Sequence, residues 1–369
     1  MSASVPDVIV VGAGPCGSTA AYEIAKAGYE VLLLERDEYP GQYNSCGGGL
    51  GNFLVKKFDL PEKILHKKIR TVQLHLGEEI KTYRAEQPIY VSIKRTEFDR
   101  FLAGRATQAG AQLRCLQKVI DYDPYHRRLK ILDRPSGALW DIQGKLVIFA
   151  DGATTQAWTS CRVGVDPAQA PIIGIAYELG YPDNPHEAFE FFFDEQKLAY
   201  GYYWIFPTKD TLNVGMGGPR DKLGGQAGRM LAEFIAARTD LAQLKPVRKS
   251  SGIIPGRLAS QFHGEGIMVV GDAGGFVNPL TGGGIYLGMV SAQMAARVAC
   301  EAFSCGRFDS PFFSRYTRRI KTSPYYAGLK VFHAMVNYSQ RHLKRTGRPI
   351  LGKIFKLYSD IGDIALRKL

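Results

Sequence analysis

The sequence predicts an α/β fold: a largely parallel sheet covered by helices, with an inserted antiparallel β-sheet and a C-terminal helical region. A strand–turn–helix–strand pattern fills residues 7–35. Apolar and aromatic runs alternate between residues 172 and 218, which is typical of an antiparallel sheet. From about residue 284 the sequence is mainly helical, and its final stretch is basic.

Length and composition indicate a globular protein with two domains or one elaborated domain. The chain has 369 residues, of which 45% are hydrophobic. No apolar run reaches the ~18 residues needed to span a bilayer, and no signal peptide precedes the first strand. The six cysteines show neither a CxxC pair nor zinc-ligand spacing. We therefore expect reduced thiols, no metal site and a cytoplasmic location.

The positive charge is concentrated at the C-terminus. Residues 315–369 contain 13 Lys and Arg but only two acids, a net +11 of the total +12. In residues 350–369 one helical face carries Leu351, Ile354, Tyr358, Ile361 and Ala365, and the other carries Lys353, Lys356, Asp360, Asp363 and Arg367. We expect this basic helical region to lie on an anionic membrane surface. The alternative is a helix docked on its own domain, and no motif supports nucleic-acid binding.

The turn after the first strand has the spacing of a nucleotide-binding motif. Gly12, Gly14 and Gly17 form GxGxxG between a strand and a helix, and Glu35 ends the second strand. The glycines admit a pyrophosphate at the helix N-terminus, and the acid can accept hydrogen bonds from ribose hydroxyls. The pattern predicts a Rossmann-like domain but does not separate NAD from FAD. The expected nucleotide contacts are Gly12, Gly14, Pro15, Cys16, Gly17, Glu35 and Arg36. Cys16 has a second interpretation, as a small residue that permits close packing.

A second glycine-rich turn favours FAD. Gly271 and Asp272 follow a buried strand, and Gly282, Gly283 and Gly284 precede a helix that begins near Ile285. The ribityl chain and ring of FAD need such a second site, whereas NAD does not. Asp272 can hold ribityl hydroxyls, and the glycines can bring helix N–H groups to the flavin edge, where negative charge develops on reduction.

Several motifs resemble those of a known family. The turns GAGPCG, Ala150-Asp151-Gly152 and GDAGG resemble those of p-hydroxybenzoate-hydroxylase-like flavoproteins. Over about residues 5–310 the chain looks most like the geranylgeranyl reductase family. The narrower match consists of Ser45-Cys46-Gly47-Gly48-Gly49 (CxGG loop), Arg95 to Leu102 (RxxFDxxL), Tyr202 to Pro207 (YxWxFP) and the trailing Gly215-Met216-Gly217. The turn at Asp151 departs from the pattern, because it lacks the usual downstream Ser-x-x-Arg. Thr155 and Arg162 are the nearest equivalents, but they do not have the family's spacing.

The resemblance implies a discontinuous FAD-binding domain over residues 1–70, 95–170 and 255–310. Residues 71–94 and 171–254 would form a substrate-binding β-sheet domain. Residues 311–369 would form the basic helical region. The expected cofactor contacts then also include Cys46, Gly47, Arg95, Asp151 and Gly152.

The resemblance places the loop of Cys46, Gly47 and Gly48 at the flavin face, where it is expected to be catalytic. An alkene without an activating carbonyl needs a proton on one carbon as hydride reaches the other. The Cys46 thiol, or a water that it positions, can supply that proton. The alternative is an inert buried thiol.

The resemblance makes the aromatic strand the expected substrate wall, whereas composition alone favours core packing. Tyr202, Trp204 and Phe206 share one face of a strand, which suits a polyprenyl chain. Core packing is the alternative. The expected substrate contacts are Tyr202, Trp204, Phe206, Pro207, Gly215 and Gly217, and Tyr202 and Trp204 are also expected in catalysis.

We therefore predict an FAD-dependent reductase that saturates C=C bonds of an isoprenoid chain, with hydride from reduced flavin N5 and a proton. The substrate would be a polyprenyl lipid, quinone, pigment or diphosphate, and the external electron donor NADPH or ferredoxin. The enzyme would be cytoplasmic and peripheral on the membrane. A flavin-dependent monooxygenase or halogenase is the alternative, although halogenases carry WxWxIP where this chain has Tyr202 and Phe206. A flavin-bound, membrane-associated binding protein without turnover is a third hypothesis.

Overall fold

The chain folds into two compact units. The computed structural model describes residues 5–43, 45–169, 171–194, 197–198 and 201–366. Unit 1 comprises Met1–Tyr43, Thr96–Pro171 and Ile254–Val331. Unit 2 comprises Asn44–Arg95, Ile172–Ile253 and Phe332–Leu369.

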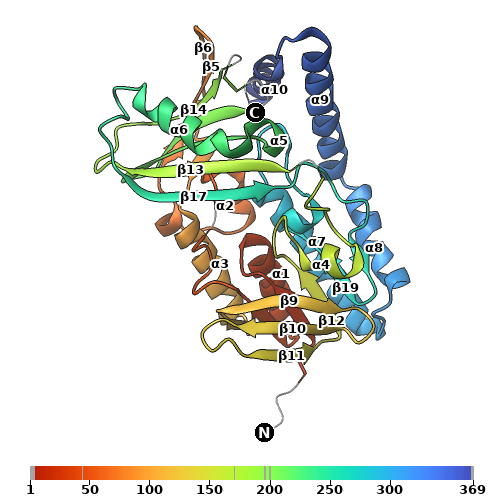
Figure 1. Ribbon diagram of the computed structural model, residues 1–369. Coiled ribbons are helices and arrows are strands. Elements are labelled where there is room, and N and C mark those ends of the chain that lie inside the picture. The colour runs from red at the N-terminus through yellow and green to blue at the C-terminus, as the bar shows by residue number, and fades with distance from the viewer. Residues whose placement is uncertain (1–4, 44, 170, 195–196, 199–200, 367–369) are drawn as a thin grey trace. The chain divides into compact units, whose positions relative to one another are not determined.

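Unit 1 is built on a six-stranded sheet (Figure 1). Its strands, in spatial order, are β18 (His263–Gly264), β19 (Ile267–Val269), β12 (Leu146–Phe149), β1 (Val8–Val11), β2 (Val31–Leu34) and β8 (Gln112–Arg114). Neighbouring strands are parallel except for β18 and β19. Every residue of β1, β2 and β12 is buried, as the central strands of a parallel sheet covered on both faces require.

Helices complete unit 1. Helices α1 (Pro15–Lys26) and α7 (Ile285–Cys305) contact each other closely, because both bury alanines along their length. Helix α3 (Arg95–Gln108) buries Phe98, Leu102 and Ala106, which lie on one helical face. The remaining elements are α4 (Gln156–Cys161), η3 (Gly271–Gly274), α8 (Ser310–Lys321) and a three-stranded antiparallel sheet of β9 (Gln117–Asp123), β10 (Arg128–Asp133) and β11 (Leu139–Gln143).

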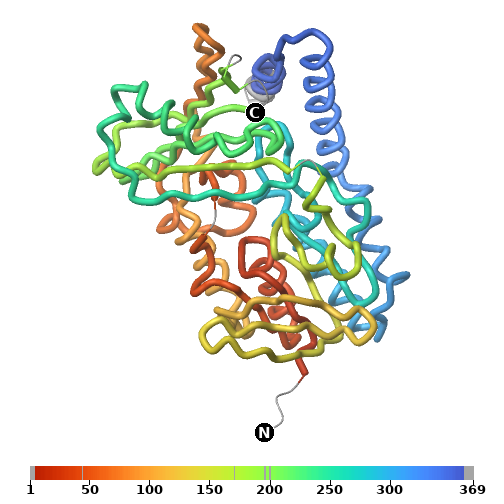
Figure 2. Tube along the Cα trace, in the orientation of Figure 1, coloured from red at the N-terminus to blue at the C-terminus, as the bar shows by residue number. Residues whose placement is uncertain are grey.

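Unit 2 is built on a seven-stranded sheet. Its strands, in spatial order, are β17 (Pro246–Ile254), β13 (Ile172–Gly180), β16 (Thr211–Pro219), β15 (Tyr202–Pro207), β14 (Ala188–Phe193), β5 (Thr71–Leu76) and β6 (Glu79–Arg84). We expected an antiparallel sheet, but it is mixed, because β5 joins β14 in parallel. Figure 2 shows this junction of segments that are far apart in the sequence.

Smaller elements surround the large sheet of unit 2. Strands β3 (Gly49–Gly51), β7 (Tyr90–Ser92) and β4 (Lys68–Ile69) form a small antiparallel sheet. The helices are α2 (Phe53–Lys57), η1 (Glu62–Ile64), α5 (Arg220–Leu223), η2 (Gly224–Gln226), α6 (Ala227–Ala236) and α10 (Leu351–Leu366). Helix α9 (Pro324–Thr346) begins in unit 1 and continues into unit 2.

The compact units divide the chain elsewhere than at the expected boundaries. Residues 44–70 group with unit 2, because β3 and β4 pair with β7. The C-terminal region does not stand apart. Helix α8 belongs to unit 1, where the Tyr316 hydroxyl donates to the Val269 carbonyl at 2.9 Å, and α10 belongs to unit 2.

Candidate active site

The first glycine turn, in unit 1, has the shape of a phosphate cradle. Gly12 has φ +97°, and a Cβ there would lie 2.6 Å from the Ala150 carbonyl oxygen. A Cβ on Gly17 would lie 1.8 Å from the Gly12 carbonyl oxygen, so both positions require glycine. Gly14 is the N-cap of α1, with no side-chain cap, and Pro15 starts the helix. The N-terminal amide groups of α1 are therefore open to a pyrophosphate.

Glu35 lies beside this turn, at the end of β2. Its Oε2 accepts from the Ala13 N–H at 2.9 Å, and its Oε1 accepts from the Asp37 N–H at 3.0 Å. Burial raises the pKa of Glu35, while the two N–H groups lower it. Each oxygen keeps a second lone pair, which fits a ribose diol. The neighbouring Arg36 side chain is largely exposed and lies 3.6 Å from the Asp37 carboxylate.

The Asp151-Gly152 turn follows β12 and carries an unsatisfied acceptor. The Asp151 Oδ2 accepts from the Gln156 N–H at 2.8 Å, but its buried Oδ1 has no hydrogen-bond partner among the described residues. Burial raises the pKa of Asp151. Thr155 caps α4 through the Ala157 N–H. Buried polar atoms are rarely left unpaired, so the orphaned oxygen fits contact with a bound cofactor.

The second glycine turn lies between β19 and α7. The Gly271 N–H donates to Ser291 Oγ at 3.0 Å, and a Cβ on Gly284 would lie 3.1 Å from Asp272 Oδ1. Gly282 has φ +67°, and its N–H donates to the Asn278 carbonyl at 2.8 Å. Helix α7 starts at Ile285 without a side-chain cap. The positive end of this 21-residue helix suits the electron-rich edge of a reduced flavin.

Cys16 fills the space between the two turns of unit 1. A Cβ on Gly271 or on Gly288 would lie 2.5 Å from its Sγ. This contact accounts for Cys16 as a packing residue, as its second interpretation expects. A direct contact between Cys16 and the cofactor stays a prediction.

The Cys46 loop, residues 45–49 of unit 2, lies across the face of the large sheet. Ser45 Oγ donates to the Gly174 carbonyl of β13 at 3.3 Å, and Asn213 Nδ2 of β16 donates to the Cys46 carbonyl at 2.9 Å. Gly48 has φ +76°, and its carbonyl accepts from the Ile93 N–H at 2.8 Å. The Gly48 N–H lies 3.3 Å from the Cys46 sulfur. The loop is thus anchored at Ser45, Cys46 and Gly48, on both sides of the thiol.

The aromatic face of β15 lies directly under this loop. Ring centroids are 6.1 Å apart for Tyr202 and Trp204, and 6.4 Å apart for Trp204 and Phe206, so the three rings share one face. A Cβ on Gly47 would lie 2.9 Å from the Phe206 ring, and one on Gly215 would lie 2.2 Å from the Trp204 ring. These glycines leave room for the Phe206 and Trp204 rings beside the loop and β16.

Register explains why these groups meet. In β16, Gly217 lies opposite Tyr202, Gly215 opposite Trp204, and Asn213 opposite Phe206. Each aromatic residue thus faces a neighbour across the ladder on the same side of the sheet. Pro207 ends β15 and is buried.

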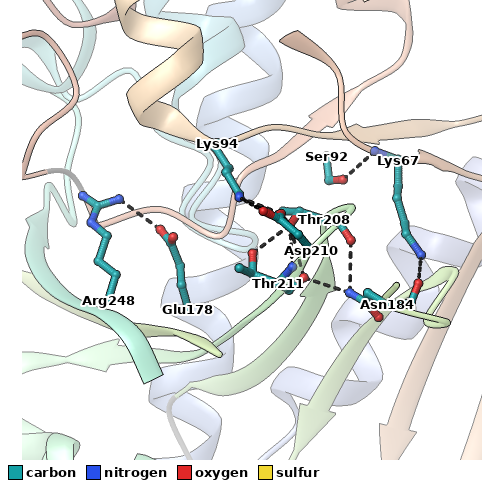
Figure 3. A network of polar contacts seen from close by, with 9 residues as sticks. All are labelled: Lys67, Ser92, Lys94, Glu178, Asn184, Thr208, Asp210, Thr211 and Arg248. Atoms are coloured by element: carbon teal, nitrogen blue, oxygen red, sulfur yellow. Dashed lines mark hydrogen bonds and ion pairs between the residues drawn. The ribbon is translucent and has the colours of Figure 1, made fainter. Parts of the chain in front are cut away.

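A polar cleft in unit 2 borders Cys46. Its lining residues are Cys46, Ile93, Lys94, Arg95, Glu178, Thr208, Thr211, Asn213 and Arg248. Figure 3 shows two ion pairs here: Arg248 with Glu178 at 3.0 Å, and Lys94 with Asp210 at 2.6 Å. The Lys94 ammonium lowers the pKa of Asp210. The thiol therefore adjoins fixed charges as well as apolar rings.

The expected site residues divide between the two units. Unit 1 holds the glycines and acids expected at FAD, apart from Cys46, Gly47 and Arg95. Unit 2 holds every expected catalytic and substrate residue. Our sequence reasoning missed Asn213, Glu178 and Arg248. Only Asn213 left a signal, because it precedes Gly215 by two residues and so shares its strand face.

The described part of the chain also bears on the expectations about metal ligands, cysteines and membrane spans. It contains no group of three or more side chains able to hold a metal ion, and its six cysteines are free thiols. None of the described helices is long and apolar enough to span a membrane.

Comparison with known proteins identifies the family. Residues 7–83 match the family model of FAD dependent oxidoreductases. Digeranylgeranylglycerophospholipid reductase 2 of Methanothermobacter thermautotrophicus is 34% identical over 332 residues, covering 85% of this chain and 82% of that protein. The digeranylgeranylglycerophospholipid reductase of Methanocaldococcus jannaschii is 32% identical, with coverage of 87% and 83%.

Solved structures share the fold. A geranylgeranyl bacteriochlorophyll reductase-like protein from Thermoplasma acidophilum superposes with a TM-score of 0.80 at 24% identity, covering 89% of this chain and 88% of that one. A flavin-dependent brominase gives a TM-score of 0.73 at 19% identity, with coverage of 99% and 93%. The scaffold is thus common to reductases and halogenases, whereas the sequence match is to the reductases. The chain belongs to the geranylgeranyl reductase family of FAD-dependent oxidoreductases.

Proposed function

We propose that the protein saturates C=C bonds in the isoprenoid chains of a prenylated glycerophospholipid. The observation that carries this proposal is the Cys46 loop held over the aromatic face of β15, in a chain 34% identical to a digeranylgeranylglycerophospholipid reductase. Each reduction adds one hydride and one proton across a double bond. The site therefore needs a hydride source, a proton donor and an apolar surface for the chain.

Unit 1 supplies the cofactor site. The turn at Gly12, with Glu35, would hold the adenosine diphosphate half of FAD, and Asp272 with the start of α7 would hold the ribityl chain and ring. When bound and reduced, FAD supplies the hydride from N5. The N-terminus of α7, which has no side-chain cap, would stabilise negative charge on the reduced ring.

Unit 2 supplies the proton and the apolar surface. The Cys46 thiol donates its proton to the second alkene carbon and regains one through the adjoining polar cleft. Tyr202 lies within the aromatic cluster, and burial raises its pKa, so its phenol stays neutral and apolar contact is favoured. In this arrangement Tyr202 and Trp204 orient the chain rather than exchange protons.

The C-terminal helix shapes that apolar surface. Phe355 of α10 is buried, and its ring lies 5.9 Å from Tyr202, 5.0 Å from Phe191 and 5.1 Å from Phe193. The Lys356 ammonium pairs with Glu79 at 2.7 Å. The inner face of α10 is therefore docked on its own unit. This agrees with the alternative interpretation of a helix docked on its own domain.

We propose that α9, rather than α10, provides the main membrane contact. Val331 and Tyr338 are more than half exposed and lie two helical turns apart on one face of α9. Arg341, Lys344 and Arg345 are exposed along the same helix. Apolar residues flanked by cations are typical of helices that lie on anionic lipid surfaces.

A flotation assay tests this surface. Lys344→Glu with Arg345→Glu should abolish co-flotation with phosphatidylglycerol vesicles. The control, Lys118→Glu with Lys130→Glu on exposed positions of β9 and β10, changes the charge equally and should leave flotation intact. Equal loss in both variants would show that only net charge matters and would reject the α9 surface.

Anaerobic turnover tests the proposed reaction. The dithionite-reduced protein, given a digeranylgeranyl glycerophospholipid, should reoxidise its flavin and yield lipids heavier by pairs of hydrogens. Cys46→Ser should keep FAD and lose most turnover, while Cys305→Ser, at an exposed thiol, should not. A product that forms only with O₂ and gains oxygen or halogen would instead establish the monooxygenase or halogenase alternative.

The electron donor can be found with the same protein. We propose NADPH or ferredoxin as the donor, and each can be mixed with the oxidised enzyme under argon. The physiological donor should bleach the flavin faster than one turnover of lipid reduction. A donor that reduces the flavin more slowly than turnover is excluded.

A further inference from the structure

One buried amide joins the two parts of the candidate catalytic centre. Asn213 of β16 is buried; its Nδ2 donates to the Cys46 carbonyl at 2.9 Å, and its Oδ1 accepts from Trp204 Nε1 at 2.8 Å. Gly47 of the loop also lies against the Phe206 ring, but Asn213 hydrogen-bonds to both the loop and the indole. The thiol loop and the aromatic face therefore meet at this amide.

The hydrogen-bonding chemistry of the two partners restricts which side chain can join them. A backbone carbonyl can only accept, and an indole N–H can only donate. The bridging group must donate to one and accept from the other, and it must be short enough to fit between β16 and the loop. Asparagine meets both conditions, and the partners themselves determine which end of the amide faces which group.

The neighbours of Asn213 restrict its movement. Phe206 lies opposite it in β15, and Glu178 lies opposite it in β13. The Cys46 carbonyl that it holds belongs to the same residue as the thiol. Ser45 and Gly48 hold the loop on either side, but neither of their anchors reaches the aromatic strand. Asn213 is thus the contact that relates the sulfur to the ring against which a substrate chain would lie.

We propose that Asn213 is a positioning residue that sets the register of the Cys46 thiol against the aromatic face. This inference rests on the proposed function and adds to it the residue that aligns proton donor and substrate. Displacing a reacting group by about 1 Å can slow a reaction about 100-fold, so one such contact is enough to control proton delivery.

Two variants test the proposal. Asn213→Asp keeps the acceptor for Trp204 but places a second oxygen against the Cys46 carbonyl, and Asn213→Ala removes both bonds without adding charge. Each should retain FAD and lower kcat about 30- to 100-fold, with little change in KM for the prenyl lipid. The solvent deuterium isotope effect on kcat should rise, because proton delivery becomes slower than hydride transfer.

Asn184 provides a matched control. It is also buried in unit 2, and its Nδ2 donates to the carbonyls of Thr208 at 3.1 Å and Thr211 at 2.8 Å. Asn184→Asp creates the same clash of oxygens against the Thr208 and Thr211 carbonyls and leaves both bonds of Asn213 in place. It should lower the melting temperature as much as Asn213→Asp does, and leave the isotope effect unchanged.

The outcomes separate the inference from the proposed function. Unchanged kcat and isotope effect in both Asn213 variants, or changes matched by Asn184→Asp, would overturn the positioning role while the reductase stands. If the wild type reduces no prenyl lipid, the proposed function fails. Alkylation of Cys46 then tests whether Asn213 positions the thiol. Iodoacetamide should then modify Cys46 at a rate that changes several-fold in both Asn213 variants and not in Asn184→Asp. An unchanged rate would reject the inference.

Discussion

The two units build their sites in different ways. In unit 1 the proposed cofactor site is mainly backbone at the ends of β1, β12 and β19, with the carboxylates of Glu35, Asp151 and Asp272 beside it. Its glycines act within a few residues of each other in the sequence or across adjacent parallel strands. In unit 2 the candidate catalytic centre consists of side chains from separate strands, joined by Asn213 and by ring contacts. The first design depends on backbone conformation and the second on packing, so the two should fail differently.

The largest effect should come from the backbone of unit 1. Gly12→Ala places a Cβ on a residue whose φ is +97°, and this Cβ would lie 2.6 Å from the Ala150 carbonyl oxygen. The nearest atoms belong to the backbone, which cannot move aside as a flexible side chain can. We expect FAD affinity to fall by about 1000-fold, equivalent to about 4 kcal/mol, measured by flavin absorbance after gel filtration. Gly104→Ala in α3, with open space around its Cβ, should bind FAD normally. Full flavin content in Gly12→Ala would remove this turn from the cofactor site.

Substitutions in the packed core of unit 2 should lower the free energy of unfolding and leave the flavin content unchanged. Phe355→Ala removes a buried ring and should cost about 3–5 kcal/mol of the free energy of unfolding of unit 2, measured by denaturant titration. Leu357→Ala, two residues along α10 and 54% exposed, should cost less than about 0.5 kcal/mol. Equal losses would mean that α10 is not docked through Phe355.

Substitutions that crowd the aromatic face should lower the turnover rate. Gly215→Ala drives a methyl group to 2.2 Å from the Trp204 ring and should lower prenyl-lipid turnover about 100-fold with FAD still bound. Gly228→Ala in α6, with nothing near its Cβ, should be neutral or slightly stabilising. Normal turnover in Gly215→Ala would mean that the indole position does not matter for the reaction.

The smallest effect should appear on acidification, with opposite signs in the two units. In unit 2 burial would raise the pKa of Glu190, but hydrogen bonds from His186 and His75 lower it to about 2. Its ionised form therefore stabilises unit 2 above pH 4.5, and that stability is lost as the pH falls from 4.5 toward 2. In unit 1 burial raises the pKa of Asp151, so protonation on mild acidification adds stability to the folded protein without cofactor.

Urea titrations between pH 6 and pH 3 measure this difference. Glu190→Gln should lose about 2 kcal/mol at pH 6 and show a flatter acid limb than the wild type. Asp151→Asn should remove the gain in unit 1. Identical acid limbs for Glu190→Gln and wild type would contradict the role of the His186 and His75 hydrogen bonds.

Local pattern was sufficient where the structure is local. Residues 8–35 form the expected strand–turn–helix–strand unit, and the alternating runs after residue 172 form strands of the expected β-sheet. The parallel pairing of β5 with β14 could not be predicted, because a strand carries no local mark of a partner more than 100 residues away. The grouping of residues 44–70 with unit 2 was missed for the same reason.

The C-terminal helix shows the same division. Its amphipathic spacing predicts a helix, and α10 spans residues 351–366. The sequence did not indicate which surface covers its apolar stripe, since a membrane and a sheet bury the same residue types. The ring contacts of Phe355 decide that the inner face meets β14 and β15.

By itself, the sequence determined the glycine turns and the family, because glycine, acid and aromatic residues at characteristic spacings reflect backbone requirements that act over short distances. The cofactor contacts and the catalytic role of the Cys46 loop stay predictions. Tertiary structure alone decided how the Cys46 loop lies on the aromatic face. Asn213, Gly215 and Trp204 meet Cys46 only through strand register, and register depends on the packing of the whole sheet rather than on any one segment.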